Sequence, residues 1–226
     1  MAKPRVQVDA VVIGSFMVFT AVIAIMFPSL YVEDESVRNV CAVIGFIFVI
    51  LGALLRMSAR GYKKAVSQQS SALVTGGPYK LVRNPMYLGT FLAGVGFIFP
   101  LFPLWTIAIF SAVFYLRFVV EIRKEQKFLQ AAFGKQYEEY CRMVPAFIPT
   151  INSVGRVTFK EVFPWKYLWT TKEKYGLFYL PALNVLFWFL QRQIFWKGMT
   201  YIPVFANALI ALLMLTWIIV SVVEEG

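Results

Sequence analysis

Histidine is absent from this 226-residue sequence, and only 15% of the residues are charged. The absence of histidine excludes the Ser-His-Asp and Cys-His catalytic arrangements, and it also excludes haem and zinc sites that use histidine ligands. The two cysteines, Cys41 and Cys141, stand in an apolar and a basic stretch and show no metal-ligand spacing. We therefore expect neither a disulfide nor a metal site, and any proton transfer must use Glu, Asp, Tyr, Lys or Cys.

Long apolar runs dominate what is present. Hydrophobic residues make up 59% of the chain, whereas about 45 to 50% is usual for soluble domains. A spanning helix needs about 20 apolar residues, and the 84–116 run is long for one helix and contains Pro100 and Pro103, which favours a helical hairpin. We predict an all-α, polytopic transmembrane bundle with about six spans, including this hairpin. The uncharged runs are 10–32, 39–55, 84–116, 175–191 and 198–223.

The charge is biased, with 22 Lys and Arg against 12 Asp and Glu. In a membrane protein such an excess usually records orientation, so we expect no nucleic-acid partner. If both termini are cytoplasmic, every basic residue except Arg38, Arg192 and Lys197 falls on the inside. We therefore predict an integral membrane protein with both termini in the cytoplasm, in the plasma (inner) membrane of a bacterium.

Between the second and third predicted spans, the sequence LVTGGPYKLVRNPMYLGT is not explained by hydrophobic periodicity. Pro85 suits the first turn of a helix, and Asn84 would be its N-cap. Free backbone N–H groups and the positive helix end would then face a site beside Arg83. On these residues alone, a capped helix start with a snorkelling arginine explains the motif as well as a binding site does.

A second polar cluster follows the predicted hairpin. Arg117, Glu121 and Glu125 recur at intervals of four residues and so share one helix face at the membrane exit. Carboxylates at this depth need cationic partners, and Arg83 and Arg117 are the expected ones. A structural ion pair and a binding site explain Glu121 equally well.

The largest predicted water-facing piece is residues 117–174. Its first part predicts a helix that leaves the membrane and bends along the surface. Its later part, FPWKYLWTTKEKY, mixes aromatics with lysines as an anchoring belt at the membrane interface does. We expect one membrane domain, 1–226, with a core at 38–150, an interfacial linker at 151–174 and a C-terminal hairpin at 175–223.

The two clusters together resemble a known group. GPYKLVRNPMYLG followed by KEQKFLQAAFGKQYEEYCRMVPAFIP is similar to the isoprenylcysteine carboxyl methyltransferase and phospholipid methyltransferase family of integral membrane enzymes. The resemblance covers roughly residues 73–149. The residues that match the family pattern are Arg83, Asn84, Pro85, Tyr87, Gly89, Glu125, Leu129, Phe133, Gly134, Tyr137, Tyr140, Arg142, Pro145 and Pro149.

The resemblance implies a methyltransferase that uses S-adenosylmethionine. It gives Arg83 and Glu125 the catalytic roles and implies that the acceptor is lipophilic: an isoprenoid, a prenylcysteine-like carboxylate or a phospholipid head group. Membrane lipids are then the expected surroundings and partners, and the oligomeric state is left open. The implied cofactor-binding residues are Asn84, Pro85, Tyr87, Leu88, Gly89, Glu121, Tyr137, Tyr140 and Arg142.

Two departures from the family pattern bear on the acceptor. Asn84 stands where the prenylcysteine enzymes have histidine, and Gln126 stands where a second glutamate is usual. The Arg-Asn-Pro variant resembles a less characterised bacterial branch. Asparagine can both donate and accept hydrogen bonds, so Asn84 is expected to replace the histidine as a polar partner.

Other functions remain open at this point. A membrane reductase with a nicotinamide cofactor would also place a polar loop beside an apolar tunnel, but no G-x-G-x-x-G sequence is present. A transporter or non-enzymatic bundle is the third possibility, although the charge gathers at one membrane face and not at the midplane. Gly89, Ala93 and Gly96 recur at helical spacing, which predicts either close helix packing or a groove for an alkyl chain.

Overall fold

The computed structural model describes residues 35–69 and 72–197, and every regular element in those residues is a helix. The chain divides into two compact units, residues 35–185 and residues 1–34 with 186–226, and the first contains all the predicted site residues. The all-α class is confirmed for the described residues. The elements are α2 (Glu35–Gln69), η2 (Gly77–Lys80), α3 (Pro85–Leu101), α4 (Thr106–Phe133), α5 (Lys135–Met143), α6 (Ile151–Gly155), α7 (Phe159–Val162), α8 (Trp165–Leu168), η3 (Lys172–Tyr175) and α9 (Gly176–Lys197).

The first described helix, α2, is 35 residues long, which corresponds to about 52 Å. Among the described helices it is the one long and apolar enough to cross a membrane, over Ser36–Ser67. It contains the predicted span 39–55 but does not end there. Residues 56–69 lie beyond the predicted span, but they lack proline and are rich in Arg, Lys, Ala and Gln, so the helix continues through them.

The other predicted spans are only partly covered. Helices occupy 84–116 and 175–191 as expected, in α3, α4 and α9. The predicted spans at 10–32 and 198–223 lie outside the described residues. The count of about six spans therefore stays a prediction.

The predicted helical hairpin is confirmed by α3 and α4. α3 ends at Leu101, with Pro100 in its last turn, and α4 begins at Thr106. Pro103 lies in the connection, where its carbonyl accepts hydrogen bonds from the backbone N–H and the hydroxyl of Thr106. The two prolines thus mark the hairpin turn, as the sequence indicated.

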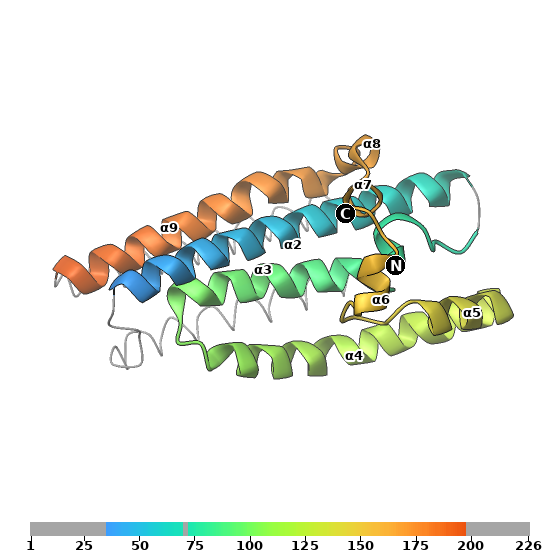
Figure 1. Ribbon diagram of the computed structural model, residues 1–226, viewed down its shortest axis with the longest axis horizontal. Coiled ribbons are helices and arrows are strands. Elements are labelled where there is room, and N and C mark those ends of the chain that lie inside the picture. Colours follow the sequence, from blue (N-terminus) through green and yellow to red (C-terminus); the bar gives the residue numbers. More distant parts are fainter. Residues whose placement is uncertain (1–34, 70–71, 198–226) are drawn as a thin grey trace, which may run out of the picture. The chain divides into compact units, whose positions relative to one another are not determined.

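Small residues hold α2 and α3 together, and the two helices lie side by side in all three views (Figure 1). A Cβ added at Gly52 would lie 2.5 Å from the Gly89 carbonyl oxygen, and one at Gly45 would lie 2.5 Å from the Gly96 oxygen. Ala93 faces the same contact and is 7% exposed. The small residues of α3 therefore pack against the backbone of α2, and of the two alternatives that the sequence left open, these contacts favour close helix packing over an alkyl groove.

Aromatic rings fill the contact between α3 and α4. The Phe91 ring lies 5.7 Å from Phe110 and 5.2 Å from Phe114, centroid to centroid. Phe114 also lies 4.3 Å from Phe118 on its own helix, and Phe147 joins from the segment after α5 at 5.6 Å from Phe91. Tilted and edge-on ring pairs at these distances stabilise the contact beyond the area they bury.

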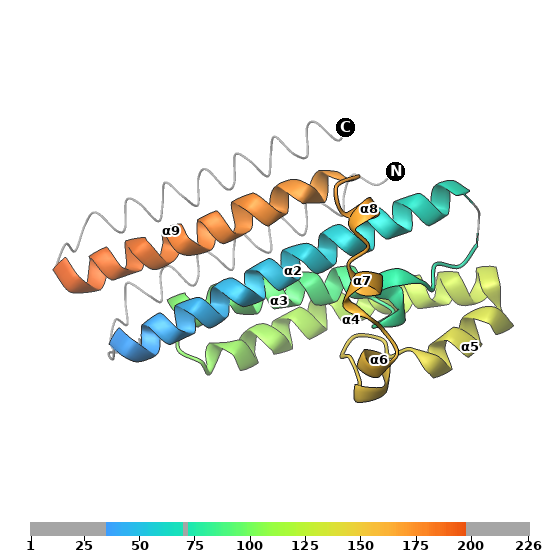
Figure 2. The same ribbon diagram turned by 45° about the horizontal axis from the view of Figure 1, so that its top comes forward.

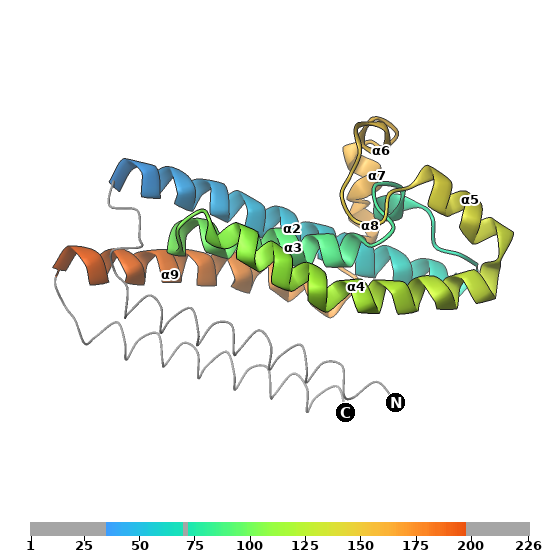
Figure 3. The same ribbon diagram turned by 90° about the horizontal axis from the view of Figure 1, so that it is seen from below.

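The end of α4 differs from the expectation of a helix that bends along the membrane surface. α4 runs unbroken from Thr106 to Phe133, and the chain then reverses at Gly134, whose φ is 49°. Such a positive φ costs glycine little. α5 consequently folds back beside the last turns of α4 (Figure 3).

Residues 151–174, which we call the crossing segment, contain α6, α7, α8 and η3. Figure 2 shows α6, α7 and α8 following one another across the direction of α2. Two capping boxes, Thr150 with Ser153 and Thr158 with Glu161, start α6 and α7. The crossing segment also packs against α2: Ser58 donates a hydrogen bond to the Val162 carbonyl. It is thus a packed part of the core and not only a linker.

Candidate functional site

The site begins at η2, which turns the chain from α2 towards α3. Gly77 has a φ of 58°, and a Cβ there would lie 2.8 Å from the Tyr62 ring. Only glycine fits both constraints easily. The turn places Tyr79 against α5, where its backbone carbonyl accepts a hydrogen bond of 2.7 Å from the Tyr140 hydroxyl. η2 and α5, 61 residues apart, are joined in this way.

Arg83 stands between η2 and the start of α3 and reaches α5. Its guanidinium donates to the Cys141 sulfur, and its charge also acts on Tyr137 and Tyr140. The Nε of Arg83 is buried without a hydrogen-bond partner among the described residues. A buried donor of this kind is costly unless a ligand or water satisfies it. The predicted pairing of Arg83 with Glu121 or Glu125 is not seen among the described contacts.

Asn84 occupies the predicted N-cap position of α3, and Pro85 is the first helical residue. The Asn84 side chain does not cap the helix; its amide donates 2.8 Å to the Ala146 carbonyl. The backbone N–H of Arg83 donates 2.8 Å to the Pro145 carbonyl beside it. Asn84 therefore fastens the segment after α5 to the start of α3, a long-range role that the motif did not indicate.

Glu125 is joined to α3 by Tyr87, whose hydroxyl donates 3.3 Å to the carboxylate. Tyr87 also packs on Phe118 of α4, with 5.1 Å between ring centroids. Tyr79 lies near the same carboxylate: burial raises the pKa of Tyr79, and the negative charge of Glu125 raises it further. The two motifs of the sequence thus meet at Tyr79, Tyr87 and Glu125.

Glu121 has partners on its own helix. Its carboxylate lies 4.0 Å from Arg117 and 3.3 Å from Lys124. The expected Arg117 partner is therefore confirmed for Glu121. Glu121 thus contacts two cations of its own helix, and Glu125 contacts the hydroxyl of Tyr87 on α3.

Tyr137 and Tyr140 lie on the buried side of α5, 4% and 5% exposed. They form a core cluster with Leu73 and Val144. Burial raises the pKa of Tyr140, so its hydroxyl stays a neutral donor to Tyr79. Arg142, predicted to bind the cofactor, is exposed on α5, and no contact is recorded between it and this cluster.

Leu88 and Gly89 were also predicted to bind the cofactor. Leu88 belongs to a buried cluster with Leu55 and Val82, and Gly89 contacts the backbone of Gly52. Both residues therefore lie against α2 and not beside Glu125. Their role in binding stays a prediction, while their packing role is plain from the contacts.

Several site residues were missed by sequence reasoning. Tyr79 lies one turn before Arg83 in the same motif, so it could have been noticed. Cys141 stands beside the predicted Tyr140, but a lone cysteine gives little signal. Glu173 gave none: its carboxylate accepts from Arg56 at 3.2 Å and Arg60 at 3.0 Å.

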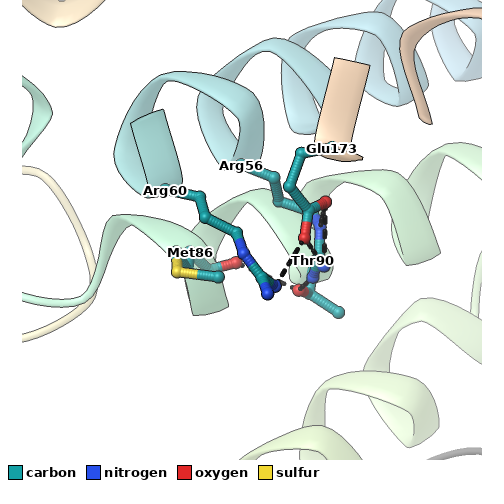
Figure 4. A network of polar contacts seen from close by, with 5 residues as sticks. All are labelled: Arg56, Arg60, Met86, Thr90 and Glu173. Carbon is teal, nitrogen blue, oxygen red and sulfur yellow. Dashed lines mark hydrogen bonds and ion pairs between the residues drawn. The ribbon is translucent and has the colours of Figure 1, made fainter. Parts of the chain in front are cut away.

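Figure 4 shows this second polar group close to the start of α3. Arg56 of α2 donates to Glu173 of η3 and to the Thr90 hydroxyl of α3, and Thr90 in turn donates 3.0 Å to the Met86 carbonyl. One carboxylate thus connects η3 to two arginines of α2. The arrangement fixes α2, α3 and η3 to one another on the side of α3 opposite the aromatic rings.

Comparison with known proteins identifies the region that contains these residues. Residues 37–136 match the family model described as phospholipid methyltransferase. The chain is 33% identical over 117 residues to protein-S-isoprenylcysteine O-methyltransferase B of Arabidopsis thaliana, covering 48% of this chain and 59% of that protein. It is 33% identical over 135 residues to the protein-S-isoprenylcysteine O-methyltransferase of Saccharomyces cerevisiae, covering 56% of each.

A methanethiol S-methyltransferase from Crocosphaera subtropica is 40% identical over 76 residues, which are 33% of this chain and 28% of that one. No solved structure matches. The chain spans about half the length of the curated relatives it matches. The family consists of integral membrane proteins that use S-adenosylmethionine. Residues 37–136, from α2 to the start of α5, are thus similar to the phospholipid methyltransferase family.

Proposed function

We propose that this protein transfers a methyl group from S-adenosylmethionine to a lipophilic acceptor at the cytoplasmic face of the membrane. The observation that carries the proposal is the meeting of the two family motifs: Tyr87 of the first motif donates to Glu125 of the second, inside the region matched by the family model. We further propose a single membrane domain with both termini in the cytoplasm of a bacterium.

The residues at this junction fit the cofactor. S-Adenosylmethionine carries a carboxylate, an ammonium, a sulfonium and ribose hydroxyls. Arg83 has a buried Nε donor without a partner among the described residues, which suits the carboxylate. Glu125 can accept hydrogen bonds from hydroxyl or ammonium groups. Tyr79, Tyr137 and Tyr140 are placed to shape the walls of such a site.

For methyl transfer the protein mainly has to position the cofactor and the acceptor. The cofactor supplies a methyl carbon on a positively charged sulfur; its bond to sulfur breaks as the bond to the acceptor forms, and the sulfur keeps the electron pair. Arg83 and Glu125 would hold the reacting groups in line, and the rings between α3 and α4 would exclude water. No histidine is needed. If the acceptor is a carboxylate, two opposite charges disappear in the transition state, which a low dielectric favours.

An amine acceptor would need a base to remove its proton. Of the two carboxylates on this face of α4, Glu121 lies beside Arg117 and Lys124. Glu125 accepts a hydrogen bond from the Tyr87 hydroxyl, at the point where the two family motifs meet. Because of this position we assign Glu125 the role of base and Glu121 a supporting one.

The acceptor class follows from the family and from the departures at Asn84 and Gln126. Asn84 is engaged by the Ala146 carbonyl, so its side chain is occupied where the prenylcysteine enzymes carry histidine. We therefore favour an isoprenoid or phospholipid acceptor over a prenylcysteine carboxylate.

Binding and turnover test this proposal separately. Calorimetry in detergent should detect binding of S-adenosylmethionine and of its demethylated product. Incubation of the purified protein with labelled S-adenosylmethionine and a total lipid extract should then label one lipid, whose mass identifies the acceptor. Folded protein that shows neither heat of binding nor a thermal shift with either compound would refute the methyltransferase function.

A further inference from the structure

The crossing segment exposes large apolar side chains outside the long helices. Ile151 is 92% exposed, Phe159 71% and Trp165 72%. These three residues begin α6, α7 and α8 respectively. Isolated exposed apolar residues are ordinary, but three so exposed within 15 residues indicate a surface that meets something other than water.

The level of this segment along α2 is fixed by two contacts. Ser58 donates to the Val162 carbonyl, and a Cβ at Gly61 would overlap the Tyr167 carbonyl. The apolar part of α2 ends at Leu55, and the charged part begins at Arg56. The crossing segment therefore contacts α2 within about two helical turns of Leu55, where the apolar part of α2 that suits the hydrocarbon layer ends.

The orientation agrees with this level. In Figures 1 and 2, α6, α7 and α8 follow one another across the direction of α2, so a bilayer crossed by α2 would have the three short helices lying along its surface. Aromatic residues such as Trp165 are favoured at this depth, where ring and head groups meet.

The charge of the exposed face is positive. The crossing segment contains two acidic residues, and both are paired with cations outside it: Glu161 with Lys80 at 2.8 Å, and Glu173 with Arg56 and Arg60 of α2. Arg156, Lys160 and Lys166 are exposed on the same segment. The combination of exposed apolar and basic side chains is complementary to an anionic lipid surface.

We propose that the crossing segment is a binding surface for anionic phospholipid head groups of the bilayer that the protein itself spans. Ile151, Phe159 and Trp165 enter the acyl boundary, and Arg156, Lys160 and Lys166 bind the phosphates. The Lys80–Glu161 pair and the Val162 contact connect this surface to η2 and α2. The proposal does not depend on methyl transfer.

Trp165 provides a direct test of insertion. The purified full chain is placed in nanodiscs whose lipids carry bromine either near the head group or deep in the acyl chain. Head-group-proximal bromine should quench the emission that the Trp165→Phe variant lacks, and deep bromine should quench that emission much less. Absence of quenching of the Trp165 emission by the head-group-proximal bromine would overturn the proposal. Quenching that appears only when the protein is diluted to monomers would also overturn it, because a second copy would then cover the surface.

Charge provides an independent test. In nanodiscs of phosphatidylglycerol and phosphatidylcholine, Lys160→Gln with Lys166→Gln should lower the preference for phosphatidylglycerol by about fivefold for each lysine, since one cation near an anionic surface contributes about 1 kcal/mol. The matched control, Lys127→Gln with Lys135→Gln, removes the same charge at the far end of α4 and start of α5. The measurement is competition with spin-labelled phosphatidylglycerol. Equal loss in both pairs, or none in either, would contradict a specific lipid surface.

Discussion

The two sides of α3 make different kinds of contact with their neighbouring helices. Towards α2, Gly89, Ala93 and Gly96 bring backbone against backbone, so that a single added methyl group has no space. Towards α4, the contact is made by large rings such as Phe91 and Phe114. Backbone cannot move aside without moving a helix, whereas rings can change rotamer. The first side therefore fixes the hairpin in place, and the second can adjust beside the polar site.

This contrast also changes where we expect the chain of a lipophilic acceptor to enter. A groove for a lipid chain was one of two alternatives for Ala93 and the glycines around it, but the backbone of α2 occupies that space. Enlarging Ala93 would disturb packing for any acceptor, long or short. A lipophilic chain that reaches Glu125 has to enter on the ring-lined side of α3.

The largest effect should come from breaking the α2–α3 contact. Gly52→Ala places a methyl group 2.5 Å from the Gly89 carbonyl oxygen and 2.6 Å from the Ala93 nitrogen. Overpacking against backbone should cost about 3 kcal/mol, seen as a lower thermal midpoint and less folded protein in detergent. Gly155→Ala is the control, because a Cβ there meets nothing within 4 Å. Equal midpoints for the two variants would show that α2 and α3 are not held as described.

On the ring-lined side, Arg83→Ala and Glu125→Ala should abolish turnover while the protein still folds. Removing one preorganised polar group commonly lowers kcat by about a hundredfold or more. Lys166→Ala and Trp169→Ala on the crossing segment should change activity little. The readouts are turnover of the labelled acceptor and the yield of extracted protein. Loss of folded protein in both site variants would instead indicate structural roles, since an uncompensated buried charge costs about 3 to 5 kcal/mol.

A smaller change is expected from Tyr87→Phe. It removes the hydrogen bond to Glu125 but keeps the ring on Phe118. The thermal midpoint should fall only slightly, because one such bond contributes about 1 kcal/mol. The kcat should fall, because the Glu125 carboxylate loses the hydrogen bond that holds it beside α3. An unchanged kcat would show that this hydrogen bond does not contribute to the function of Glu125.

The smallest effect concerns the surface pair of Lys80 and Glu161. The hydrogen bond and charge of Lys80, with hydrogen bonds from Thr158, lower the pKa of Glu161 to about 2. A lowered pKa means that the contribution to stability is present above about 4.5 and is lost as the pH falls towards 2. The protection factor of the Thr158 amide against hydrogen exchange should fall over that interval, because this amide donates to the carboxylate. In Glu161→Gln this fall should be missing.

The sequence predicted the parts of this fold that depend on neighbours along the chain. Pro100 and Pro103 located the hairpin turn, and Pro85 after Asn84 located the start of α3, because capping and proline act within one turn. The hydrogen bond of the Asn84 side chain was not predicted, because its partner, Ala146, lies 62 residues away. For the same reason Glu173 was not anticipated: its partners lie 113 and 117 residues before it.

The site was predicted to a similar extent. Arg83 and Glu125 were chosen from family spacing, and Tyr87 and Glu125 do meet, but Arg83 faces α5 and not a carboxylate. Nothing in the spacing of α4 revealed that it would run unbroken to Phe133. Helix formers continue past the expected bend, and only Gly134 stops them.

The length of α3 has a consequence for the membrane itself. Its 17 residues correspond to about 26 Å, whereas a typical hydrocarbon layer is about 30 Å thick. Proline near each end prevents the helix from growing to meet the difference. If the hairpin spans the bilayer as predicted, either the bilayer thins around it or the Arg83 end is drawn below the lipid carbonyls. Hydrophobic mismatch would thereby set how deeply a lipid acceptor must descend to be methylated. Turnover should consequently decline as the acyl chains of the nanodisc lipids lengthen from roughly 14 to 22 carbons, because longer chains thicken the bilayer. A rate that does not change with chain length would show that the hairpin does not sense the thickness of the bilayer.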